Sequence, residues 1–139
     1  MIDPHNSVTR MRIRELMDVR LRPTVDPLLL PGVCWLLAHG FPMPVRRTSR
    51  NGEYYESKRA FTSQGRQCWV VAVGRKPRKN VRWSATVAVY GNPQERELAD
   101  DLEPYNSISA DMAVGVQVAR LDEALAKYDK EKENGNKDS

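Results

Sequence analysis

Cysteine and histidine are scarce in this chain, which has two residues of each among 139. Cys34 and Cys68 lie beside Trp35 and Trp69, in apolar surroundings where a free cysteine behaves as a small buried hydrophobe. No Cys-x-x-Cys pair and no Cys/His spacing indicates zinc, and a disulfide is unusual in a reducing compartment. We therefore expect two buried thiols, no metal and no cofactor.

Long apolar runs are also lacking. The best run, Leu28 to Ala38, is interrupted by Pro31 and Gly32, and it is shorter than the roughly 20 residues of a transmembrane helix. The N-terminal residues do not show the basic and then apolar order of a secretion signal. We expect a cytoplasmic protein that does not contact a membrane.

Groups that could catalyse a reaction are few and scattered. A hydrolase or nuclease needs carboxylates and a histidine placed together, or a metal site. The central region contains only Glu53 and Glu56, while His5 and His39 have no catalytic partner nearby in the sequence. Because there is no Gly-rich phosphate loop either, we expect no enzyme and name no catalytic residue.

Acidic residues are rare in the middle of the chain. From Arg46 to Arg82, eleven basic residues oppose two acidic ones, a local charge of about +9, whereas from Pro93 onward twelve acidic residues oppose six basic ones. Aromatic residues lie within this basic block or directly after it: Tyr54, Tyr55, Phe61, Trp69 and Trp83. Cations displace counterions from a phosphate backbone and aromatic rings stack on bases, so the block suits nucleic-acid binding. A solvated basic surface with its aromatics in the core is the alternative.

Hydrophobic alternation and turn residues predict an antiparallel sheet. Strands are expected at 54–62, 67–73 and 81–90, with a turn at 63–66 and loops at 46–53 and 74–80. Within the last strand, Trp83, Ala85, Val87 and Val89 fall on one face, which should point to the core. The other face carries Arg82, Ser84, Thr86 and Ala88 and should be open.

Apolar periodicity and capping residues predict the helices. They are expected at 9–20, at 26–39, from Pro93 onward and at about 110–130, although 113–118 could also form a strand. The last helix carries a short heptad seam, which indicates intramolecular packing or, less often, a homodimer contact. The seam consists of Val114, Val118, Leu121, Leu125 and Tyr128.

These elements predict an α+β fold: a small antiparallel sheet of three or four strands, packed by N-terminal helices and a C-terminal helix. We expect one domain over 1–130, with its basic sheet and helix core at 46–103. Residues 131–139 are charged and without apolar anchors, so a disordered tail is expected there.

The segment from Trp69 to Ala99 resembles the ethylene-response-factor (APETALA) type of DNA-binding domain. The resemblance lies in Trp69 in the middle strand, in the basic turn 75–80, and in a last strand that ends in Tyr90-Gly91 before a helix. That family has a three-stranded antiparallel sheet and a packed helix, and its sheet lies in the major groove.

The resemblance implies a set of DNA-contacting residues. The pattern of β alternation independently places three of them on the open face, and the basic turn would hold phosphates without reading sequence. For Trp69, which also occupies a family position, core packing is the favoured interpretation. The nucleic-acid-binding candidates are Arg66, Arg75, Lys76, Arg78, Lys79, Arg82, Ser84 and Thr86.

Our first hypothesis is therefore a DNA-binding accessory protein of a phage or mobile element that contacts duplex DNA through a basic sheet face. The alternative is a protein-interaction module, such as a phage-encoded inhibitor that docks on a host protein. A weaker third hypothesis is a binder of single-stranded nucleic acid or RNA.

Overall fold

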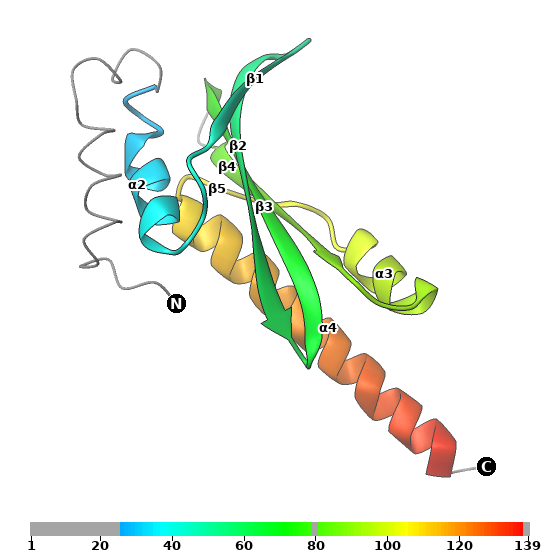
Figure 1. Ribbon diagram of the computed structural model, residues 1–139. Coiled ribbons are helices and arrows are strands. Elements are labelled where there is room, and N and C mark those ends of the chain that lie inside the picture. Colours follow the sequence, from blue (N-terminus) through cyan, green and yellow to red (C-terminus); the bar gives the residue numbers. More distant parts are fainter. Residues whose placement is uncertain (1–25, 79–80, 138–139) are drawn as a thin grey trace.

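The computed structural model describes residues 26–78 and 81–137, so the helix predicted at 9–20 lies outside the described residues. An open sheet of five antiparallel strands, arranged in sequence order, forms the centre of the molecule (Figure 1). The predicted α+β class is confirmed, with one strand more than the upper expectation of four. The strands are β1 (Val45–Ser49), β2 (Gly52–Ser63), β3 (Arg66–Arg78), β4 (Val81–Val89) and β5 (Tyr105–Ser107).

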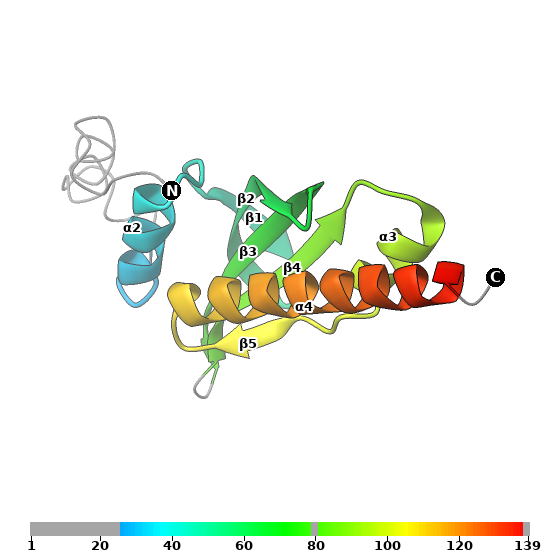
Figure 2. The ribbon, with the colours of Figure 1, turned by 90° about the horizontal axis from the view of Figure 1, so that it is seen from below.

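Three helices are described: α2 (Leu30–Ala38), α3 (Pro93–Asp100) and α4 (Ala110–Lys137). Each matches a predicted helix, and residues 113–118 belong to α4, not to a strand. Helix α4 runs along one face of the sheet (Figure 2). Helix α3 begins with a capping box, in which Asn92 accepts from the Glu95 amide and the Glu95 side chain accepts from the Asn92 amide.

Two strands were not predicted. Residues 46–53 were expected to form a loop, but β1 pairs with β2, and Ser49 lies opposite Gly52 across a two-residue turn. The short β5 pairs with the first half of β4. Strand β1 shows no alternation of apolar and polar residues and is exposed throughout, and β5 is only three residues long, so neither carries the local signal of a strand. These pairings depend on the neighbouring strands.

The loop expected from Gly74 to Asn80 is also shorter in the structure. Strand β3 continues to Arg78, with an irregular register against β4 between Gly74 and Arg78. Proline is tolerated in a strand at such an irregularity, because no ladder hydrogen bond needs its missing N–H. Pro77 therefore did not end the strand.

Where composition predicted a disordered tail from Glu131, the structure continues α4 to Lys137. Lysine and glutamate are good helix formers, and adding residues to an existing helix needs no new nucleation. The low apolar content of this segment therefore did not prevent helix formation.

The core lies between the sheet and the helices, with Trp83 at its centre. The Trp83 ring is 2% exposed and lies against two glycines, Gly32 of α2 and Gly74 of β3. A Cβ atom at Gly32 would lie 2.4 Å from the ring, and one at Gly74 would lie 2.8 Å from it. Because any side chain at these two positions would clash with the Trp83 ring, both positions require glycine.

The heptad seam of α4 packs within the molecule. Val114, Leu121 and Leu125 are buried in the core, and Val118 is half-buried against it. Among the described residues, no helix is long and apolar enough to cross a membrane.

Candidate nucleic-acid interface

The two faces of the sheet have different surroundings. Alternate residues of β4, from Trp83 to Val89, are buried under the helices, as predicted. We call this side the covered face and the opposite side the open face. By strand alternation and register, the open face carries Val45, Arg47, Ser49, Tyr54, Glu56, Lys58, Ala60, Thr62, Gln67, Trp69, Val71, Val73, Arg75, Arg82, Ser84, Thr86, Ala88 and Asn106.

Arginines gather at one end of the open face. Arg47, Tyr54 and Arg75 lie directly opposite one another on β1, β2 and β3. Arg82 is on the same face of β4, next to Trp83, which pairs with Gly74. We call Arg47, Arg75 and Arg82 the arginine row. It lies at the end of the sheet where the β1–β2 and β3–β4 hairpins turn.

Two cations of the open face lie over aromatic rings. The Arg75 guanidinium is 4.8 Å from the centre of the Tyr54 ring, and Lys58 Nζ is 4.6 Å from that of Trp69. Such contacts stabilise exposed cations by about 0.5–1 kcal/mol and leave their N–H groups free to donate. The cations are therefore held in place and still able to bind an anion.

Glu56 is the only acidic residue among the open-face positions described. Its carboxylate lies 3.6 Å from Arg47 Nε. Among the described residues, Lys58, Arg75 and Arg82 form no ion pair, and the Nε atoms of Arg82 and of Trp69 have no hydrogen-bond partner. The open face is thus electropositive, with donors that its own residues do not satisfy.

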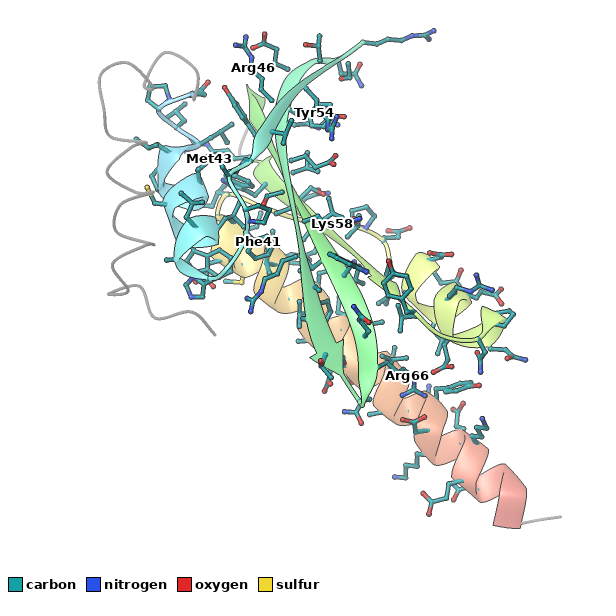
Figure 3. All side chains as sticks on the ribbon, in the orientation of Figure 1. Phe41, Met43, Arg46, Tyr54, Lys58 and Arg66 are labelled. Carbon is teal, nitrogen blue, oxygen red and sulfur yellow. The ribbon has the colours of Figure 1, made fainter. Side chains whose placement is uncertain are left out.

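Arg66 lies at the opposite end of the sheet and on the covered face. It donates to both Asp129 oxygens, at 3.0 and 2.7 Å, and also to Glu95. The hydrogen bond with Asp129 raises the pKa of Arg66 and lowers that of Asp129. Figure 3 shows Arg66 beside α4, far from Arg46 and Tyr54. This arginine therefore joins β3 to the two C-terminal helices and is not part of the open face.

The other predicted contact residues are placed as follows. Ser84 and Thr86 both lie on the open face, as do Arg75 and Arg82. Ser84 is half-buried and Thr86 is exposed. Lys76 and Arg78 lie in the last residues of β3, and their side chains, like the whole of Lys79, are outside the described part of the chain. Trp83 is buried in the core, whereas Trp69 is half-buried on the open face.

Two other arginines of the basic block bind groups of the protein itself. Arg46 points to the other side of β1 and pairs with Glu53, which raises the pKa of Arg46. Arg59 donates to the backbone carbonyl of His39. The charge of the block is therefore only partly available on the open face.

Sequence reasoning did not name four open-face residues as contact residues: Arg47, Tyr54, Lys58 and Asn106. Arg47 was missed because 46–53 was expected to form a loop, whereas it lies in β1 opposite Tyr54. Tyr54 and Lys58 are four residues apart in β2, so the alternation of the strand predicted at 54–62 already placed them on the same face. Asn106 occupies a three-residue strand whose own sequence carries no periodic signal.

The two cysteines of the chain lie in α2 and on the covered face of β3. Cys34 and Cys68 are free thiols, and burial raises the pKa of both. Within residues 26–78 and 81–137, no three His, Cys, Asp or Glu side chains are grouped to hold a metal ion.

No protein-family model, curated protein or solved structure matches this chain, so the interpretation of the open face depends on its own geometry.

Proposed function

We propose that this protein binds duplex DNA through the open face of its sheet, with the arginine row on the phosphate backbone. The observation that carries the proposal is the placement of Arg47, Arg75 and Arg82 together at one end of a face on which Glu56 is the only acidic residue described. Arginine suits phosphate because its planar group donates two parallel hydrogen bonds.

The hairpin turns extend the same end of the sheet. Arg50 is exposed in the β1–β2 turn, and the β3–β4 hairpin contains Lys76, Arg78 and Lys79 in its sequence. A duplex laid across this end would meet Arg50 of the β1–β2 turn and the arginine row of the face beside it. Duplex DNA is favoured over a single strand because a β-ribbon fits into the major groove.

The test measures affinity for a labelled random-sequence duplex by fluorescence anisotropy over a range of salt concentrations. Each phosphate contact contributes about 0.9 to the slope of log K against log salt. The double variant Arg75→Ala, Arg82→Ala should therefore lower the slope by about 2 and weaken binding to all sequences alike.

The matched control is Arg96→Ala, Arg120→Ala, which removes two exposed arginines from α3 and α4. It should leave both affinity and slope unchanged. If both double variants lost the same amount of affinity, net charge alone would attract the DNA, and the open face would have no special role. Single-stranded DNA and RNA probes in the same assay would reveal a preference for unpaired bases.

A protein partner is the second candidate function, favoured by one observation. Trp69, Val71 and Val73 form a half-buried apolar stripe along the centre of the open face. Exposed apolar stripes of this kind are typical of protein interfaces. Such a partner would bind with little salt dependence, and Val71→Asp would abolish its binding while Arg75→Ala would have a small effect.

A further inference from the structure

Two polar side chains lie side by side next to the arginine row. Ser84 of β4 is paired in register with Asn106 of β5, and both are on the open face. Asn106 is exposed and Ser84 is half-buried. Among the described residues, neither side chain has a hydrogen-bond partner.

Two serines on the covered face, in contrast, donate hydrogen bonds within the molecule. Ser57 donates to the Pro42 carbonyl at 2.7 Å, and Ser63 donates to Asp122 at 2.8 Å. The hydroxyls of Ser57 and Ser63 are therefore satisfied within the molecule. The Ser84 and Asn106 groups are directed to the side where a ligand would supply the partner.

The position of this pair fits a groove beside phosphate contacts. Successive residues on one face of a strand are about 6.7 Å apart, so Ser84 lies one such step from Arg82. Strand β2, with Lys58, is two strand spacings or about 10 Å from β4. The major groove is about 12 Å wide and is bordered by phosphates on both sides. Strands β4 and β5 can therefore enter the groove while Lys58 and Arg75 reach the backbone.

We infer that Asn106, assisted by Ser84, contacts base edges in the major groove and makes the protein sequence-selective, with adenine as the base that Asn106 recognises. The inference rests on the proposed function, duplex binding through the open face. The carboxamide of asparagine matches the N6 donor and N7 acceptor of adenine in a bidentate contact. A hydroxyl such as that of Ser84 can donate to or accept from a neighbouring base.

The experiment selects binding sequences from a random duplex library and then measures affinity for the selected site and for scrambled DNA. Wild type should enrich a site containing a required A·T pair. Asn106→Ala should reduce the preference for that site by about tenfold or more, while the affinity for scrambled DNA and its salt slope stay unchanged. Ser84→Ala should reduce the preference by a smaller factor.

The control variants are Asn134→Ala, an exposed asparagine of α4, and Gln94→Ala, an exposed amide of α3. Both should keep the full preference. Circular dichroism and a urea titration check that each variant folds as wild type does.

The outcomes separate the two proposals. Salt-dependent binding without any enriched sequence, or an unchanged preference in Asn106→Ala, would overturn the inference and leave the proposed function standing. Failure of wild type to bind any duplex would overturn both.

Discussion

Among the described residues, Ser57, Ser63 and Arg66 on the covered face form side-chain hydrogen bonds, whereas Arg75, Arg82 and Ser84 on the open face form none. Strand β3 shows this with two residues of one type. Arg66 faces the helices and donates to Asp129 and Glu95, while Arg75 faces away and lies over the Tyr54 ring. Both arginines belong to the same basic block in the sequence.

The difference shows how one stretch of charge can serve two purposes. A cation near the core must be paired, because an unpaired buried charge is costly. A cation on the open face needs no internal partner, because water can solvate it. Residue type therefore identifies the block, but the face of the strand decides what each member can do.

The largest expected contrast concerns the tryptophans. Trp83→Ala on the covered face should lower the free energy of unfolding by about 3–5 kcal/mol, because it removes the ring packed between Gly32 and Gly74. Trp69→Ala on the open face should cost less than half as much, since its ring is only half-buried. Urea denaturation followed by circular dichroism measures both. An equal loss of unfolding free energy in the two variants would contradict the division of the sheet into a covered and an open face.

The arginines of β3 should differ by a smaller amount. Arg66→Met removes hydrogen bonds to two carboxylates and should destabilise the fold by about 2 kcal/mol. Arg75→Met should change the stability by less than about 0.5 kcal/mol, as for other exposed residues. The same urea titration applies. A stability loss in Arg75→Met as large as in Arg66→Met would mean that Arg75 has a structural role.

The serines provide a finer comparison. Ser63→Ala breaks the hydrogen bond to Asp122 and should lower the free energy of unfolding by about 1 kcal/mol. Ser84→Ala removes a hydroxyl without a partner among the described residues and should leave stability unchanged. Thermal midpoints of the two variants, measured side by side, test this. If Ser84→Ala melts earlier than Ser63→Ala, the Ser84 hydroxyl is structural.

The smallest expected effect is a dependence on pH. The hydrogen bond from Arg66 lowers the pKa of Asp129 below its ordinary value of 3.8, so the ionised carboxylate favours the folded state. This stability is fully present above the unfolded pKa and is lost as the pH falls through the folded pKa. Urea midpoints between neutral pH and about pH 3 should therefore fall less steeply in Asp129→Asn than in wild type. If the urea midpoints of wild type and Asp129→Asn fell equally with pH, the Arg66–Asp129 pair would not contribute to the pH dependence of stability.

Several parts of the fold were predictable from local sequence. The long strands β2 and β4 have clear two-residue alternation, and α3 begins at Asn92-Pro93 with Glu95 in its first turn. The extent of β3 was not predictable, because Gly74 and Pro77 are typical of loops. Its continuation depends on pairing with β2, where Gly74 lies opposite Tyr55.

The candidate site was predictable in part. Arg82, Ser84 and Thr86 followed from alternation within one strand, and the structure places all three on the open face with Arg75. Arg66 was assigned to the same set because charge density alone cannot show which face a residue occupies. Asn106 was not considered, since its place beside Ser84 results from a strand pairing between segments 22 residues apart.

By itself, the sequence determined the class of the fold, the concentration of positive charge in the middle of the chain and the two-sided character of β4. Composition and periodicity are local properties, and they suffice for these features. Only the tertiary structure decided which cations are paired and which are free, and which polar groups from separate strands meet. Those outcomes depend on register and on the helices that cover one face, and both arise from contacts between residues far apart in the chain.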